Sequence, residues 1–515
     1  MEKIIILIMF FIVMIGIGVY CRRKATNVED FVLGGRNVGP WLTAFAYGTT
    51  YFSAVIFIGY AGKFGWSFGV AATWIGIGNA LIGSLLAWVV LGRRTRRMTN
   101  FLNAQTMPDF FEKRYNSKAI KIVSALIIFI FLVPYSASVY TGLGYLFEMA
   151  LHIPYLYCMI GMAVLTGLYL ILGGYMATAI NDFVQGIIML VGIILVVIVV
   201  LSRPEVGGLI GGINNLTNYG PQFSNIFGGN PRDLIGLIIL TSLGTWGLPQ
   251  MVHKFYAIKD DKAIRTGTVI STVFALVIAG GSYFVGSFAK LILNNKVPID
   301  ALTGKPNYDL VMPNMLNIAL PDTNTLMSIL MGVVIVLVLS ASMSTLSSLV
   351  LVSSSSLTLD FIKGIMFPKM QKDKQLLYIR IFCGIFVAAS VIVALQKGTI
   401  VTLMSFSWGA IAGSFLAPFV YGLFWKGVTK AGVWAGFITG VGITLTGLIL
   451  FLSPAFKLAP QFYRDLIIPP NVGAAAMLIS LIVVPVVSII SKKMDKSYVN
   501  NIFTCLEDTK EGIKV

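Results

Sequence analysis

Long apolar segments recur along the whole chain, and their length restricts the fold more than any other feature of the sequence. Of the 515 residues, 57% are hydrophobic and only 11% are charged. A helix needs about 20 apolar residues to cross a bilayer. About 13 such runs can be placed, at roughly 4–21, 40–62, 68–92, 120–150, 155–173, 177–202, 232–253, 268–294, 325–361, 376–396, 399–425, 431–453 and 471–491. The sequence therefore predicts an all-α, polytopic membrane protein.

The basic residues indicate how the chain crosses the membrane. The net charge is +17, from 38 Lys and Arg against 21 Asp and Glu. These basic residues cluster in short loops between the apolar runs, which is the positive-inside pattern and argues against a nucleic-acid partner. With an odd number of spans, the pattern predicts a plasma-membrane protein whose N-terminus is outside and whose C-terminus is cytoplasmic.

Two further segments are each expected to contact the membrane as a helix. The first apolar run, 4–21, has its basic residues behind it at 22–24, whereas a signal peptide carries them in front, so it is expected to remain as a membrane helix. The segment 107–115 is expected to lie as a helix at the inner interface, with Phe110 and Phe111 facing lipid.

The second half of the run at 325–361 carries a cluster of hydroxyl groups, SASMSTLSSLVLVSSSS. A lone hydroxyl in a membrane helix usually bonds back to the carbonyl four residues earlier. Here several oxygens share one depth, and at about 100° per residue one arc holds Ala341, Ser344, Thr345 and Ser348, with Ser347 beside it. Because small Ala341 also leaves its carbonyl accessible, the arc predicts binding of a small, hard cation.

Two spans carry helix-weakening residues at mid-depth. The span at 40–62 contains AYGTTYFSAV, and the span at 232–253 contains TSLGTWGLPQ, where Pro249 removes a backbone hydrogen bond. A packing kink explains either break alone. The breaks lie five spans apart, however, and inverted five-span repeats bring such breaks together at the midplane, where freed carbonyls bind ions and solutes. The residues flanking the breaks are therefore expected to line a solute pocket: Tyr51, Ser53, Thr245 and Trp246.

Asp182 also indicates ion binding. It lies several residues inside the span at 177–202, where a carboxylate is costly unless it faces a cavity or a partner. No Lys or Arg is expected in the middle of any span, so a cation from solution is the predicted partner, with the serine arc completing its shell. The alternative is a solvated carboxylate near the inner interface.

Five segments resemble the sodium/solute symporter family, in the family's order. They span residues from about 27 to 450 and read FVLGGRNVGPWLTAFAYGTTYFSA, GGYMATAINDFVQG, GLPQMVHKFYAIKD, ASMSTLSSLVLVSSS and LFWKGVTKAGVWAGFITG. The second and third are most similar to the proline and pantothenate branches. The resemblance implies a LeuT-like core of two inverted five-helix repeats. The implied divisions are an extra N-terminal helix and inner loop (1–36), the repeats (37–202 and 203–430), two C-terminal helices (431–491) and a cytoplasmic tail (492–515).

The resemblance also implies particular site residues. The principal sodium site would use carbonyls and hydroxyls of Thr49, Phe52, Ala341, Ser344 and Thr345. A second sodium site, found in some members, would use Asp182, Ser344, Ser347 and Ser348. The chain departs from the proline branch at the solute pocket, because Tyr51 stands in place of an aspartate, and Thr241 and Thr245 stand in place of aromatic residues.

These features predict a sodium-coupled symporter that imports a small organic solute by alternating access. A carboxylate-bearing solute (an amino acid, a pantothenate-like acid or another monocarboxylate) is favoured, because helix N-termini at the breaks attract anions. A sugar or sialic acid, or proton coupling through Asp182, is the alternative. No continuous polar pore and no catalytic motif is found, which argues against a channel and an enzyme. The expected partners are the solute, sodium ions and lipid, without an obligate protein partner.

Overall fold

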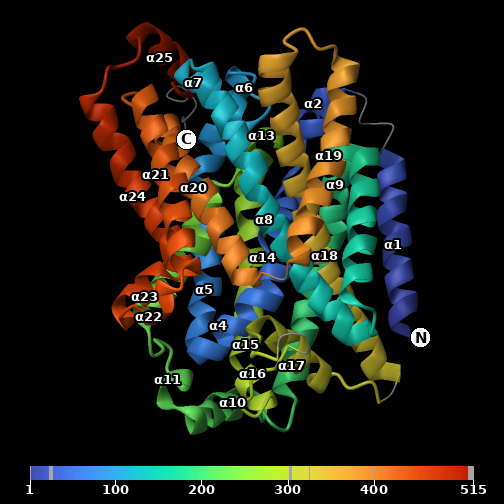
Figure 1. The fold of residues 1–515 in the computed structure, drawn as a ribbon. Coiled ribbons are helices and arrows are strands. Elements are labelled where there is room, and N and C mark those ends of the chain that lie inside the picture. The colour runs from blue at the N-terminus through green and yellow to red at the C-terminus, as the bar shows by residue number, and fades with distance from the viewer. Residues whose placement is uncertain (1, 22–26, 301–303, 324, 397, 508–515) are drawn as a thin grey trace, which may run out of the picture.

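The computed structural model of the chain is a bundle of long helices (Figure 1). It describes residues 2–21, 27–300, 304–323, 325–396 and 398–507, so the basic residues at 22–24 lie outside the described part. Within that part, the only β-structure is two isolated bridges. Eleven described helical segments are long and apolar enough to cross a membrane. The predicted all-α, polytopic architecture is confirmed.

The number of such segments is smaller than the predicted 13 for a local reason. Breaks divide the second and third predicted spans into short pieces, and the whole of 55–101 counts as one segment. The pieces are α3 (Pro40–Tyr51), η3 (Val55–Tyr60), α4 (Ala61–Phe68), η4 (Gly69–Ala72), α5 (Thr73–Gly78), η5 (Asn79–Leu86), η6 (Trp88–Gly92) and α6 (Arg93–Phe101). The fifth and sixth predicted spans form one element, α9 (Tyr155–Leu201), which is kinked at Gly174, where φ is 58°. With ψ at −151°, this backbone conformation is one that glycine adopts far more readily than any residue with a Cβ.

Most of the other spans are continuous, except the second broken span at 231–257. They are α1 (Glu2–Cys21), α8 (Lys118–Leu151), α12 (Pro231–Ile238) with η8 (Ile239–Leu243), η9 (Gly244–Trp246) and α13 (Pro249–Ala257), α14 (Asp261–Ala275) with η10 (Leu276–Gly280), α15 (Gly281–Ser287) and α16 (Ala289–Ile292), α18 (Thr325–Ser356) with η12 (Leu357–Met366), α19 (Lys372–Leu395), α20 (Ile400–Phe424), α21 (Lys430–Leu452) and α24 (Pro469–Ile490).

Short helices lie in the connections. They are α2 (Val28–Leu33), η2 (Gly34–Arg36), α7 (Met107–Tyr115), α10 (Gly208–Leu216), η7 (Thr217–Tyr219), α11 (Pro221–Ser224), η11 (Tyr308–Leu310), α17 (Val311–Ala319), α22 (Ala455–Leu458), α23 (Gln461–Ile467), α25 (Lys496–Phe503) and η13 (Thr504–Leu506). In Figure 1, α6, α7 and α25 lie at one end of the bundle, and α10, α11 and α16 lie at the other. Helix α1 begins at the end opposite α25.

Helix α18 is the central element of the bundle. It packs against α1, α3, α8, α9 and α19, and every residue from 334 to 356 is buried. Helices α20, α21 and α24 pack together on one flank. Elsewhere small residues allow very close contact: a Cβ added to Gly65 on α4 would lie 2.2 Å from the carbonyl carbon of Gly286 on α15. Such contacts are typical of membrane helices.

The two broken spans run in opposite directions through the bundle. Residues Val38 and Ile258 form a parallel bridge, in which Val38 N donates to Ala257 O (3.1 Å) and Lys259 N donates to Val38 O (3.1 Å). Val38 lies just before the start of α3, and Ala257 ends α13. The start of one broken span therefore meets the end of the other.

The structure corrects the expected orientation of α7. Phe110 and Phe111 do not face lipid; both are fully buried. Their rings pack against Phe419, at centroid distances of 5.2 and 6.5 Å, and Phe111 also packs against Phe415 at 5.6 Å. The α7 helix thus covers the end of α20, a contact between distant segments that hydrophobicity alone does not reveal.

Candidate ion and solute site

The break after α3 exposes backbone carbonyls in the interior of the bundle. Helix α3 ends at Tyr51, and Phe52 is extended, with φ −107° and ψ 99°. The chain becomes helical again at Val55, whose N–H donates to Ser53 Oγ (3.2 Å). Helix breaks inside membrane proteins are tolerated where their polar groups find partners within the protein.

Two hydroxyls of α18 provide those partners. Ser344 Oγ donates to Thr49 O (3.0 Å) and to Ala341 O (3.0 Å). Thr345 Oγ1 lies 3.1 Å from Thr50 O, 3.3 Å from Thr49 O and 3.1 Å from Ala341 O. Both hydroxyls thus bond back to their own helix and also reach across to the break. Four of the five residues predicted for the principal sodium site meet here.

The fifth residue, Phe52, lies at the break itself. Phe52, Ser53 and Ala341 line one small cavity, together with apolar side chains from η3, α9, η10 and α18 and with Ser282 on α15. The lining is mostly apolar, and Thr49, Ser344 and Thr345 are fully buried. Neutral oxygens converging in a buried site are ligands of the kind that hard cations prefer.

The residues predicted for a second sodium site have a different environment. Asp182 on α9 is fully buried, but its Oδ2 lies 3.8 Å from Nζ of Lys254. Nζ of Lys254 also donates to Ser348 Oγ (3.0 Å). Lys254 lies near the end of the candidate span 231–257 rather than in its middle, but it is buried and its ammonium group reaches Asp182, so the expectation that only a dissolved cation would pair with Asp182 is wrong. Ser347 Oγ bonds to Ser344 O on its own helix (2.9 Å).

A hydrogen bond connects the two groups of residues. Thr50 Oγ1 and Ser348 Oγ are 2.9 Å apart. The α3 break, the α18 hydroxyls, Lys254 and Asp182 therefore form one continuous polar path.

The residues predicted for the solute pocket gather along η5. Tyr51 Oη donates to Thr241 O (2.6 Å), and Thr241 Oγ1 donates to Asn79 Oδ1 (2.9 Å). Thr245 Oγ1 donates to Gly83 O (3.1 Å), and Trp246 Nε1 donates to Ile82 O (3.0 Å). Ser53 instead lies at the α3 break. The two breaks therefore lie close together, as predicted, and η5 contacts residues from both of them.

Sequence reasoning missed two members of this region. The Trp408 ring on α20 stacks at 6.4 Å on Tyr51, which itself stacks on Phe52 at 4.2 Å. Asn79 joins the second broken span through Thr241 and Ser242. Its signal was present in the sequence, as a lone amide within the apolar stretch WIGIGNALIG. Trp408 carries no comparable signal, because a tryptophan in a span is ordinary.

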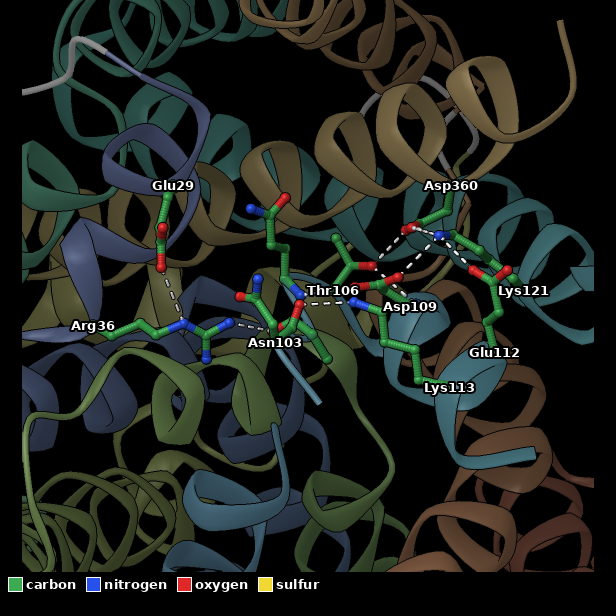
Figure 2. Close-up of polar contacts among 11 residues, drawn as sticks. Glu29, Arg36, Asn103, Thr106, Asp109, Glu112, Lys113, Lys121 and Asp360 are labelled. Atoms are coloured by element: carbon green, nitrogen blue, oxygen red, sulfur yellow. Dashed lines mark hydrogen bonds and ion pairs between the residues drawn. The ribbon is translucent and has the colours of Figure 1, made fainter. Parts of the chain in front are cut away.

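A charged network lies at the end of the bundle where α6 and α7 are found (Figure 2). Nζ of Lys121 on α8 contacts Glu112 (2.7 Å), Asp109 (2.9 Å) and Asp360 (3.5 Å). Thr106 Oγ1 donates to Asp360 Oδ2 (2.6 Å). Since Asp360 lies on η12, which continues α18, the network fixes the helix that carries the hydroxyl cluster. Burial would raise the pKa of Asp109, but the Lys121 and Lys113 ammonium groups hold that pKa below its usual range.

Comparisons with solved structures agree on the fold. The substrate-bound, outward-open state of a Na+-coupled sialic acid symporter superposes with a TM-score of 0.72 at 16% sequence identity, covering 94% of this chain and 98% of that chain. A nucleobase-cation-symport-1 family transporter, in a closed conformation with bromovinylhydantoin bound, gives a TM-score of 0.51 at 14% identity, covering 92% and 97%. The expected LeuT-like fold is confirmed.

Comparisons of the sequence with known proteins identify the family. The model of the "Sodium:solute symporter family" matches residues 31–440. A sodium/proline symporter of Staphylococcus aureus (strain JH9) is 32% identical over 503 residues, which cover 96% of this chain and 93% of that protein. The resemblance in the five sequence segments is thereby confirmed, and the chain, a multi-pass membrane protein, belongs to the sodium:solute symporter family.

Proposed function

We propose that the chain imports a small, carboxylate-bearing solute together with sodium, by alternating access. Membership of the family supports sodium-coupled symport of a small solute. The observation that carries the ion assignment is the meeting of two α18 hydroxyls, Ser344 and Thr345, with the carbonyls at the α3 break.

The proposed sodium ligands are the five oxygens supplied by Thr49, Phe52, Ala341, Ser344 and Thr345. When the ion binds, each hydroxyl turns a lone pair toward it and gives up the bond to a carbonyl, which becomes a ligand as well. Sodium then joins α3 to α18 and favours the outward-open state. Its release on the inner side separates the two helices and loosens the solute pocket.

The proposed solute pocket comprises Tyr51, Ser53, Thr241, Thr245 and Trp246. Two observations support a carboxylate there. Helix α13 begins at the break, so its positive N-terminal end faces the interior. In addition, the donors Asn79 Nδ2 and Trp408 Nε1 are buried and make no hydrogen bond of ordinary length and angle within the described residues, although the hydroxyls of Tyr283 and Tyr135 lie near them. Oxygen acceptors of a solute would satisfy them, and the Tyr51 and Trp408 rings would contact its apolar part.

In the proposed cycle, the inward-open state faces the cytoplasm. The proposed orientation has the N-terminus outside and the C-terminus in the cytoplasm, with repeats at 37–202 and 203–430. The meeting of Val38 with Ile258 supports the inverted relation, because it places the start of α3 beside the end of α13.

Uptake into proteoliposomes tests the proposal. The purified protein would be given a panel of labelled solutes (proline, pantothenate, sialic acid and glucose) with an inward sodium gradient, and with potassium replacing sodium. Uptake of one carboxylic acid that requires sodium is expected. Uptake of glucose alone would contradict the carboxylate assignment, and uptake driven by a proton gradient without sodium would contradict sodium coupling.

A further inference from the structure

Lys254 is a buried cation at the centre of three packed helices. Its side chain extends from α13, only 2% of the residue is exposed, and its ammonium group contacts Asp182 on α9 and Ser348 on α18. The same ammonium lies 5.4 Å from the centroid of the Tyr175 ring, over its face. Of the three donors of the ammonium group, one bonds to Ser348, while Asp182 lies at ion-pair distance and Tyr175 offers its ring face.

The Asp182 carboxylate, in turn, requires a positively charged partner. Neither of its carboxylate oxygens has a hydrogen-bond partner among the described residues, so within the described chain its charge is balanced by Lys254 alone at ion-pair distance. A carboxylate in the interior of a membrane protein is costly without such a counter-charge. The ammonium therefore serves the role for which a dissolved cation was expected.

The ammonium group also lies among residues that were predicted to bind a second sodium ion. Two of the four residues predicted for a second sodium site, Asp182 and Ser348, are the two that Lys254 contacts. The third and fourth, Ser344 and Ser347, direct their hydroxyls to backbone carbonyls. A positive charge is thus already fixed where a second sodium ion would bind.

We propose that Lys254 is a built-in cation that takes the place of a second sodium ion, so that each transport cycle couples the solute to one sodium. The inference rests on the proposed sodium-coupled function. A tethered charge cannot leave with the solute. It keeps α9, α13 and α18 joined in the sodium-free protein, and the bond between Ser348 and Thr50 carries this restraint to the α3 break.

The decisive variant is Lys254→Met, which removes the charge and keeps an unbranched side chain. Asp182 then lacks a counter-charge and should recruit sodium from solution. The sodium dependence of uptake should change from a Hill coefficient close to one in the parent to a value approaching two. Purified parent protein without solute should bind one radioactive sodium ion per chain, and the variant should bind two.

Three further variants separate this idea from general damage. Lys254→Met combined with Asp182→Asn should bring the Hill coefficient back to one. Lys254→Arg keeps the charge and should also give one. Lys290→Met removes another buried lysine, which packs on Trp66 and Phe223 at 4.5 and 4.2 Å rather than on a carboxylate, and should leave sodium binding unchanged.

The possible results are distinguishable. A parent protein that binds two sodium ions, or moves two per solute, overturns the inference and supports a second sodium site at Asp182. A Lys254→Met variant that folds but still binds one ion also overturns it. If that variant does not fold, the sodium-to-solute ratio of the parent alone decides. Solute uptake that does not depend on sodium at all would instead refute the proposed function.

Discussion

Ser342 and Ser344 lie two positions apart on α18, yet their hydroxyls form different hydrogen bonds. Both are buried serines on α18. Among the described residues, Ser342 Oγ donates only to Val338 O on its own helix (2.7 Å), as a lone hydroxyl in a membrane usually does. Ser344 points toward the α3 break and reaches Thr49 O as well. The side on which a hydroxyl lies therefore decides whether it is available to an ion.

This difference leads to a prediction for the sodium site. Replacing Ser344 or Thr345 by alanine removes one of about five ligand oxygens and should weaken sodium binding by about 1–3 kcal/mol, roughly 5- to 150-fold. The measurement is the sodium concentration that gives half-maximal uptake. Ser342→Ala is the matched control and should leave that concentration unchanged. If all three variants resemble the parent, the principal ion site is elsewhere.

At the scale of elements, α8 and η12 are held together by one lysine. Lys121 is 15% exposed in its side chain and faces Asp360, whose side chain is 1% exposed, as well as Asp109 and Glu112. Removing one member of a buried ion pair typically costs about 3–5 kcal/mol, because the remaining charge is left without a partner.

Lys121→Met should therefore lower the thermal unfolding midpoint of the purified protein clearly. Lys113→Met is the control: Lys113 also contacts Asp109 (2.9 Å), but its side chain is 35% exposed, so water screens the lost interaction. The control is expected to shift the midpoint much less. Equal shifts for the two variants would mean that the network does not join α8 to η12 in solution.

A second link between elements depends on pH. Asp309, on η11, is buried and accepts a hydrogen bond from Ile400 N (3.0 Å), the first residue of α20. Burial raises the pKa of Asp309 to about 6, although the bond from Ile400 and the nearby Lys63 oppose the rise. The folded protein therefore holds this proton more tightly than the unfolded chain, whose carboxyl has a pKa of about 3.9.

The sign of the pH effect follows from this difference. Stability contributed by Asp309 is fully present below about pH 4 and is lost as the pH rises through about 6, a change on the order of 3 kcal/mol. Asp309→Asn keeps the side-chain oxygen that accepts from Ile400 but cannot ionise. The unfolding midpoint of the variant should depend less on pH between 4 and 7 than that of the parent. An unchanged pH profile would show that Asp309 ionises normally.

At the scale of the whole molecule, the orientation in the membrane can be tested with thiol labelling. Cys505 is partly exposed on η13, while the other three cysteines, Cys21, Cys158 and Cys383, are buried. A membrane-impermeant maleimide should label Cys505 in inside-out vesicles and not in right-side-out vesicles. Asn218→Cys, at an exposed position of η7 at the other end of the bundle, should behave in the opposite way. The reverse result for both would invert the proposed topology.

The sequence by itself determined the features that depend on local chemistry. A run of about 20 apolar residues must be a membrane helix, because its backbone polar groups have to pair within the segment. A helical wheel places Ala341, Ser344 and Thr345 on one arc wherever the helix packs, and Pro249 lacks a backbone N–H in any surroundings. These signals were sufficient to locate both breaks and three of the residues that meet at the α3 break, and the family resemblance added the fourth, Thr49.

Only the tertiary structure decided which distant groups meet. Lys254 has the spacing of an inner-loop lysine in the sequence, yet its long, flexible stem carries the ammonium group inward to Asp182, 72 positions earlier in the chain. From the sequence, Phe110 and Phe111 are expected to face lipid, but in the structure α20 packs over them. The physical reason is the same in both cases. The cost of burying a charge or a ring depends on what lies across the interface, and that neighbour is supplied by a remote part of the chain.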